Sequence, residues 1–253
     1  MTSPAAADAE LVITGRVMPA SNATFVGVLG DVDVVYKPIA GERPLWDFPD
    51  GNLAHREVAA HLVSAALGWD VVPETWLGEG PHGPGMVQRW VTVDDTEPVT
   101  IVPHGEVPAG WRSSFEGYDD RDRPVCLIHE DSLPMRRIAV FDAVVNNADR
   151  KGGHVFAVAG GHRYGIDHGI CFHSEPKLRT VLWGWAGSPL SEDETAGLLR
   201  LRDALYGGLG DELGQWLVGW DLDALVDRCE ALLAAGTLPE PDPYRHTIPW
   251  PPF

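Results

Sequence analysis

The stretch NNADRKGGHVF (residues 146–156) is polar, contains two adjacent glycines and follows a pattern of apolar residues at helical spacing. A second stretch, YGIDHGICFH (residues 164–173), sets an aspartate between apolar neighbours. The residues that link them, HVFAVAGGHRYG, indicate a strand, a Gly-Gly turn and a second strand, because two short apolar runs flank a turn signal. We expect this hairpin to bring Asp149 and Asp167 close together.

The first part of the chain is predicted to be sheet, one helix and sheet. Apolar runs separated by turn residues indicate strands over residues 11–39, and the last run, VVYKP, places Lys37 near a strand end. NLAHREVAAHLVSAALG then predicts a helix that Asn52 caps, that ends at Gly68 and that carries Glu57 on a mostly apolar face. VVPETWLG and GPGMVQRWV predict two further strands.

The second part is predicted to be mainly helical. Residues 92–131 are acidic and weakly periodic, so we interpret them as a connection with room for one short hairpin. A helix is expected from Leu133 up to the first quoted stretch. Two more are expected in SEDETAGLLRLRDALYGGL, capped by Ser191, and in DLDALVDRCEALLAAG. The proline-rich tail, EPDPYRHTIPWPPF, is expected to lie extended on the surface.

Bulk composition limits the class of protein. A chain of 253 residues with 44% hydrophobic residues suits one large domain or two lobes. It has no run of 18 apolar residues that could span a membrane and no signal-peptide pattern at its start. Its three cysteines fit neither a disulfide framework nor a zinc motif. We therefore expect a cytoplasmic protein with no integral membrane segment.

The charge limits its partners. A formal net charge of -18 argues against nucleic acid and against docking on anionic lipid. It does not exclude a phosphate ligand, because a pocket can be locally basic on an acidic protein.

Four charged residues stand in an informative order along the chain: Lys37 on a strand, Glu57 on the next helix, Asp149 in a loop and Asp167 after a later strand. Phosphoryl transfer from ATP needs a lysine to hold phosphates and an acid to hold that lysine. It also needs an aspartate to accept the acceptor's proton and another to bind the metal. The sequence offers each of these parts.

This order resembles the protein-kinase-like superfamily. F-D-x-x-x-x-N-x-D-R (residues 141–150) resembles the catalytic loop of phosphatidylinositol 3-/4-kinase-like and HipA-like kinases, and I-D-H-G (residues 166–169) resembles their metal-binding D-x-G. Together with VYKP, GPGMVQRWV and LRTVLWGWAG, these motifs resemble an actinobacterial family similar to phosphatidylinositol 3-/4-kinases. The resemblance implies a bilobal α+β fold, with a β-rich N-lobe over residues 1–91 and a mainly helical C-lobe over residues 92–253.

The resemblance also implies roles for single residues. Asp149 would orient and deprotonate the acceptor, Lys151 would steady the transferred group, and Asp167 would hold magnesium. Lys37 would contact the phosphates of ATP and pair with Glu57. The implied nucleotide-binding set is Lys37, Glu57, Val35, Met86, Ile166, the turn residues Ser21, Asn22 and Thr24, and the backbone of the segment from Gln88 to Trp90.

Two departures from the family pattern matter. The chain has no Gly-x-Gly-x-x-Gly, so the turn over the phosphates is built from small polar residues. His154 stands where these kinases place a metal-binding asparagine. Magnesium prefers oxygen ligands and imidazole suits softer metals, so His154 either favours Mn²⁺ over Mg²⁺ or leaves one metal poorly held.

Other interpretations stay open. Each of these residues alone could be a surface charge, a turn residue or a hydrogen-bonding brace. Asp142 is a candidate partner for Arg136 or for the loop. An AMP transferase or a nucleotide-binding pseudokinase would use the same fold. Four histidines and Cys171 leave a metallohydrolase as a further alternative. The histidines are His154, His162, His168 and His173. The acceptor is unidentified: a soluble small molecule, an inositol-type headgroup or a protein. Trp183 and Trp185 either pack the core or line the acceptor site.

Overall fold

The structure is a computed structural model that describes residues 9–18, 22–49 and 51–253. The strands are β1 (Leu11–Arg16), β2 (Phe25–Leu29), β3 (Val32–Pro38), β4 (Thr75–Gly80), β5 (Gly83–Arg89), β6 (Val99–Pro103), β7 (Trp111–Tyr118), β8 (Pro124–Glu130), β9 (Val155–Ala157) and β10 (Arg163–Gly165). The helices are α1 (Leu53–Leu67), α2 (Leu133–Val145), α3 (Glu192–Leu205), α4 (Gly208–Leu213) and α5 (Gly219–Ala235). Four short 3-10 turns are η1 (Ile39–Gly41), η2 (Gly152–His154), η3 (Ala159–Gly161) and η4 (Trp183–Trp185). The predicted α+β class is confirmed.

The N-terminal sheet is antiparallel, with strand order β1-β2-β3-β5-β4. Lys37 lies opposite Met86, and Val35 lies opposite Gln88. Because side chains alternate between the faces of a strand, these four residues share one face of the sheet. Tyr36 points to the other face, where it joins a small apolar core.

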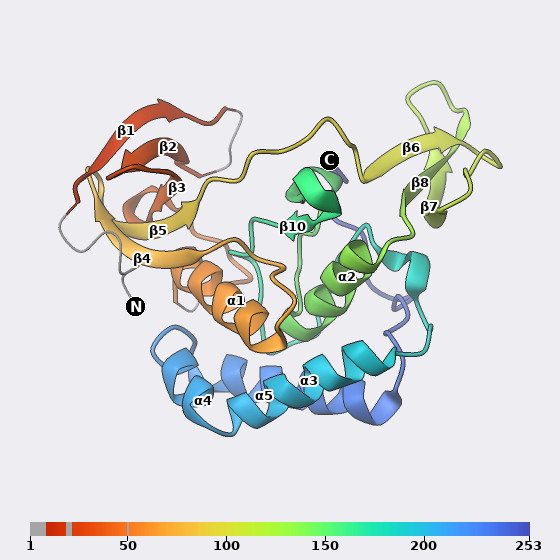
Figure 1. The fold of residues 1–253 in the computed structure, drawn as a ribbon. Helices are drawn as coiled ribbons and strands as arrows, with labels where there is room; N and C mark the ends of the chain where they lie inside the picture. The colour runs from red at the N-terminus through yellow and green to blue at the C-terminus, as the bar shows by residue number, and fades with distance from the viewer. Residues whose placement is uncertain (1–8, 19–21, 50) are drawn as a thin grey trace.

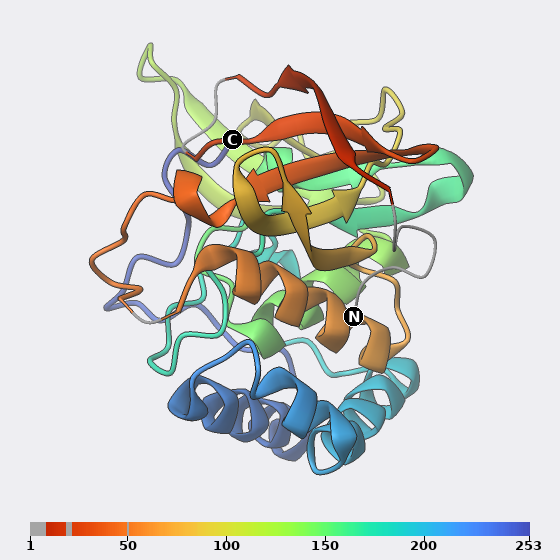
Figure 2. The same ribbon diagram turned by 90° about the vertical axis from the view of Figure 1, so that its left-hand side faces the viewer.

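Helix α1 lies between this sheet and the C-terminal helices α3 and α5 (Figures 1 and 2). Both predicted caps are confirmed: Asn52 Oδ1 accepts a hydrogen bond from His55 N at 2.8 Å, and Gly68 ends the helix in the left-handed conformation. Because protein covers the helix on both sides, its buried surface is wider than the single apolar face predicted, and Arg56 and Glu57 are both buried.

The helix start has a second cap that was not predicted. The Glu42 carboxylate accepts hydrogen bonds from Leu53 N at 2.9 Å and from Ala54 N at 2.8 Å. A carboxylate at this position satisfies free N–H groups and suits the positive end of the helix dipole.

The prediction for residues 92–131 is wrong, because they form a three-stranded antiparallel sheet of order β6-β8-β7. The central strand β8 is buried from Cys126 to His129, whereas Ile101 and Phe115 on its neighbours are exposed. The outer strands also contain polar and proline residues, which hide the alternation that would have revealed them.

The C-terminal part follows the prediction more closely. Helix α2, the β9–β10 hairpin, α3 and α5 are all present, and Ser191 caps α3 in a reciprocal capping box with Glu194. The tail is exposed over residues 241–246, but Ile248 packs against the main core and Pro249 is buried. Its last residues are therefore part of the fold. Across the described part of the chain, no helix combines the length and apolar character that a membrane crossing requires.

Candidate functional site

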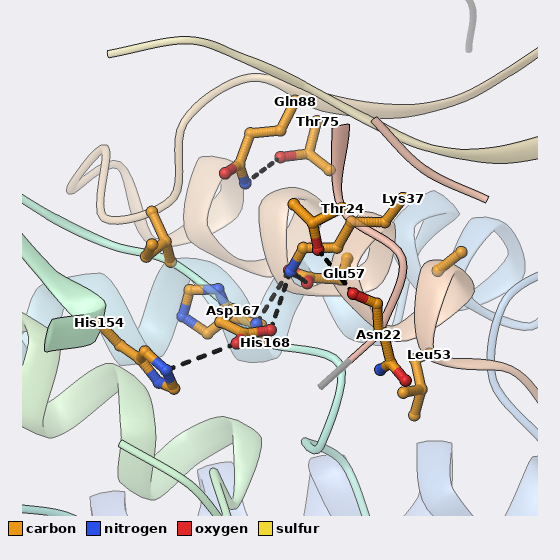
Figure 3. Close-up of polar contacts among 12 residues, drawn as sticks. Asn22, Thr24, Lys37, Leu53, Glu57, Thr75, Gln88, His154, Asp167 and His168 are labelled. Atoms are coloured by element: carbon orange, nitrogen blue, oxygen red, sulfur yellow. Dashed lines mark hydrogen bonds and ion pairs between the residues drawn. The ribbon is translucent and has the colours of Figure 1, made fainter. Parts of the chain in front are cut away.

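Lys37 joins three separate segments of the chain (Figure 3). Its Nζ donates to Glu57 Oε1 on α1 at 2.7 Å and to Asp167 Oδ1 after β10 at 2.9 Å. Glu57 is buried and its other oxygen accepts from His168 N at 2.9 Å. The Asp167 side chain is 46% exposed, so this end of the network faces solvent.

The charges in this network reinforce one another. Burial alone would lower the pKa of Lys37, but the carboxylates of Asp167 and Glu57 raise it above its ordinary value. The Lys37 ammonium in turn lowers the pKa of Asp167, against the opposing effect of partial desolvation by the surrounding protein. Both side chains are therefore charged at neutral pH.

Asp149 lies beside Lys151, with 3.5 Å between Oδ2 and Nζ. Burial raises the pKa of Asp149, while the nearby Lys151 lowers it in part. The Asp149 carbonyl accepts from His154 Nδ1 at 2.9 Å. The loop that follows α2 thus brings Asp149, Lys151 and His154 together.

His154 also faces Asp167, with 3.5 Å between Nε2 and Oδ2. A carbonyl oxygen can only accept, so Nδ1 carries the proton, and burial lowers the pKa of the ring. In the neutral ring, the Nε2 lone pair then faces a carboxylate oxygen, which is a pair of donors suited to a cation.

The donor set at this point is small. Within the described ranges, no group of three or more histidine, cysteine, aspartate or glutamate side chains could hold a metal. Asp167 and His154 fit an ion that takes its remaining ligands from phosphate and water, as Mg²⁺ commonly does at nucleotide sites.

Arg150 holds the loop and the Asp167 segment together from behind. Its Nε donates to Asp142 Oδ2 at 2.9 Å, and its Nη1 donates to the carbonyls of His154 and Ile166 at 2.9 and 3.0 Å. Its Nη2 donates to His168 Nε2 at 2.7 Å. Asp142 is therefore a partner of the loop, whereas Arg136 pairs with Glu194.

This role of Arg150 was not predicted. The motif placed the residue next to Asp149, but its partners lie up to 18 residues away. Burial lowers the pKa of the His168 ring well below its ordinary value, and the positive charge of Arg150 lowers it further. The neutral ring can then accept the hydrogen bond from Arg150 at Nε2.

The face of the N-terminal sheet above Lys37 carries the residues predicted to meet the nucleotide base. Met86 and Gln88 are buried and Val35 is half-buried. Gln88 Nε2 donates to Thr75 Oγ1 at 2.9 Å, which fixes its amide within the sheet (Figure 3). The Ile166 backbone is held by His154 and Arg150.

The backbone of the segment from Gln88 to Trp90, which is predicted to meet adenine, already makes hydrogen bonds within the protein at two of its N–H groups. The N–H of Arg89 donates to Glu74 O and that of Trp90 donates to Asp33 O, each at 2.9 Å. These two donors are already used by neighbouring strands. The chain leaves the sheet after Arg89, and Val93 then forms an antiparallel bridge with Val158.

The turn predicted to cover the phosphates is braced by its own side chains. Asn22 Oδ1 accepts from Arg43 N at 3.0 Å, and Thr24 Oγ1 donates to Asn22 O at 3.4 Å. Ser21 lies outside the described residues.

The remaining candidates make other contacts. His162 bonds to the Asp70 carbonyl, Cys171 is buried, and Trp185 is buried with its Nε1 donating to Asp131. Trp183 Nε1 donates to the Thr247 carbonyl at 2.8 Å.

Comparison with known proteins gives both a relative and a fold. Models of known protein families give no match. The kinase CtkA of Helicobacter pylori superposes with a TM-score of 0.50 at 13% identity, over 91% of this chain and 94% of that chain. A Golgi casein kinase gives a TM-score of 0.47 at 15% identity, over 90% and 71%.

The likeness to CtkA shows that the fold is protein-kinase-like, as predicted, with the sheet-rich part first and the helices after it. These comparisons do not support the more specific prediction of a relationship to phosphatidylinositol kinases. Protein Rv2133c of Mycobacterium tuberculosis is 45% identical over 261 residues, which cover 98% of this chain and 94% of that protein. The chain therefore belongs to the family of Rv2133c.

Proposed function

We propose that this protein transfers a phosphoryl group from ATP to an acceptor hydroxyl. The observation that carries the proposal is the position of Lys37, which bridges Glu57 at 2.7 Å and Asp167 at 2.9 Å. A lysine held between a buried glutamate and an open aspartate suits a site where ATP phosphates and a metal ion meet.

The nucleotide would lie under the N-terminal sheet. Val35 and Ile166, with the buried Met86 beside Lys37, would supply apolar surface for the base, and the segment from Gln88 to Trp90 leaves the sheet beside them. We place the boundary between the two lobes near Val91 for the same reason. Asn22 and Thr24 would border the phosphates.

Asp167 and His154 would hold a divalent ion. Such an ion neutralises the charge that develops on the phosphates during transfer. An imidazole ligand favours Mn²⁺ relative to an all-oxygen site, so we expect activity with Mn²⁺ to exceed that with Mg²⁺.

Asp149 would take the proton from the acceptor hydroxyl. Burial raises its pKa, which makes it a better base than an exposed aspartate. Lys151, whose Nζ lies 3.5 Å from Asp149, would contact the transferred phosphoryl group. The acidic surface favours a soluble small molecule or a protein over a membrane lipid as acceptor, which leaves the phosphatidylinositol-kinase type as one member of a wider class.

Thermal unfolding with ATP and each metal tests the nucleotide site. A ligand that binds only the folded state raises the melting temperature, so ATP with Mg²⁺ or Mn²⁺ should stabilise the wild type and not Asp167→Ala. No stabilisation of the wild type by any nucleotide would sink the proposal. ATP labelled at the γ or α phosphate then separates phosphoryl transfer from AMP transfer.

Asp149→Asn separates an enzyme from a pure nucleotide binder. The substitution removes the base and keeps the shape, so turnover should fall by about 10²–10⁴ while ATP still stabilises the fold. A protein whose product formation is indifferent to this change does not use Asp149 as a base.

A further inference from the structure

Residues 245–253, which we call the strap, cross the segment that follows Asp167. Arg245 Nη1 donates to the Pro176 carbonyl at one end of the crossing. The Thr247 carbonyl then accepts from Thr180 N at 3.0 Å and from Trp183 Nε1 at 2.8 Å. The strap is thus fixed along residues 176–183.

The strap ends on the loop that carries Asp149. The Pro252 carbonyl accepts from Gly152 N at 2.8 Å. A Cβ atom built on Gly152 would lie 2.4 Å from Cε1 of Phe253 and 3.2 Å from Cγ1 of Val99. Those distances leave no room for a side chain, because the Phe253 ring already fills the space. Gly152 directly follows Lys151, so this ring packs on the backbone of the loop that carries the proposed reaction site.

The side chains near the end of the strap are uncharged in a strongly acidic protein. The sequence TIPWPPF (residues 247–253) has no ionisable side chain, and Trp250 and Phe253 are 87% and 47% exposed. In Figure 1 the chain end lies between the N-terminal sheet and the β6–β8–β7 sheet. An uncharged and partly exposed side chain, Phe253, therefore lies against the loop that carries Asp149 and Lys151.

We propose that Phe253 gates the acceptor position and that the strap keeps bulk water away from Asp149. This inference rests on the proposed function. The reaction suppressed is hydrolysis: a water oxygen bonds to the γ-phosphorus while the bond from that phosphorus to the β–γ bridging oxygen breaks. The water proton passes to Asp149, and ADP and phosphate leave. Exclusion of water by an apolar wall prevents this loss of ATP.

Two variants move the ring by different routes. Phe253→Ala removes it, and Gly152→Ala displaces it, because the new methyl group occupies its place. Gly153→Ala is the matched control, since a Cβ there meets no atom within 4 Å. With ATP and Mg²⁺ or Mn²⁺ but no acceptor, ADP formation should rise several-fold in the first two variants and stay at the wild-type rate in the control. Adding Asp149→Asn should abolish the rise.

Nucleotide-dependent thermal stabilisation is measured on each variant to separate the two proposals. If ATP still stabilises Phe253→Ala but ADP formation is unchanged or lower, the gate is wrong and the nucleotide site stands. An equal rise in Gly153→Ala also overturns the gate, because that change leaves the ring in place. If ATP stabilises neither the wild type nor any of the variants, the proposed function is wrong, and the gate is wrong with it.

Discussion

Two ion pairs in the same network differ in how open they are. Arg150 and Asp142 are both 0% exposed. The Arg150 guanidinium donates hydrogen bonds to Asp142, to two backbone carbonyls and to His168. Lys37 and Asp167 are 22% and 46% exposed, and Asp167 Oδ2 lies 3.5 Å from His154 Nε2.

The difference in exposure suggests that one pair holds the fold together and that the other can bind a ligand. A closed pair has every lone pair and proton satisfied by protein, so it fixes the positions of the segments it joins. An open pair can exchange one partner for a ligand, and Asp167 retains an oxygen for that purpose. The substitutions below test whether the two pairs differ in this way.

Arg150→Met should be the most damaging change. It leaves Asp142 charged and unpaired in the interior, which costs about 3–5 kcal/mol of unfolding free energy. Urea unfolding monitored by circular dichroism measures the loss. The double variant Arg150→Met with Asp142→Leu removes both charges and should regain a large part of it. A cost below about 1 kcal/mol for the single change, which is typical of a surface pair, would refute the closed-pair interpretation.

Asp167→Asn should affect ligand binding far more than the free protein. The residue has a left-handed φ of 60°, which asparagine tolerates, and Lys37 keeps Glu57. We expect the free protein to lose about 1 kcal/mol or less. The stabilisation by ATP and metal, about 2.7 kcal/mol when the ligand is near 100 times its Kd, should disappear. Thermal unfolding with and without ligand gives both quantities, and a large loss in the free protein would mean that the open pair is structural.

His154→Asn should change the preferred metal. An amide oxygen replaces the imidazole, so the ratio of activity with Mn²⁺ to activity with Mg²⁺ should fall. Initial rates with each metal at saturating concentration measure this ratio. His162→Asn is the control, because His162 bonds to Asp70 away from the site. An unchanged ratio would show that His154 is a brace for the Asp149 carbonyl and not a ligand.

The smallest effect concerns pH. Burial raises the pKa of Asp149, so its basic form is lost on acidification at a higher pH than for an exposed aspartate. Lys151 lowers this pKa, so Lys151→Met should move the acid limb of kcat/KM to still higher pH. The pH profile of both proteins tests the sign. A shift to lower pH would mean that another group controls the acid limb.

The elements that the sequence predicts well are those with local signals. Helix α1 has Asn52 at its start and Gly68 at its end, and both caps depend only on neighbouring residues. The approach of Lys37 to Glu57 follows from the resemblance, because the order of the residues in the motifs implies the pairing. Likewise, the hairpin of β9 and β10 follows from its Gly-Gly turn, and it brings the segments of Asp149 and Asp167 together.

What the sequence hides is mostly long-range. Strands β6 and β8 pair across more than twenty residues, as Val99 with His129 illustrates, and neither outer strand has a clean alternation. The contacts of Arg150 with His168 and of Pro252 with Gly152 join segments whose spacing carries no signal. The use of the Trp90 N–H by Asp33 depends on the twist and register of the sheet, which propensity does not reveal.

The Glu42 carboxylate on the first N–H groups of α1 has an evolutionary consequence. These two hydrogen bonds tie Glu42, which follows β3, to the first turn of α1. They help to fix the position of Glu57 relative to Lys37 without the residues between Glu42 and Leu53. Trp46, at the tip of this connection, is 91% exposed. Phe48, two residues further on, is buried against His173, so variation that leaves the lysine–glutamate pair undisturbed is expected at exposed positions such as Trp46, where a new recognition surface can arise.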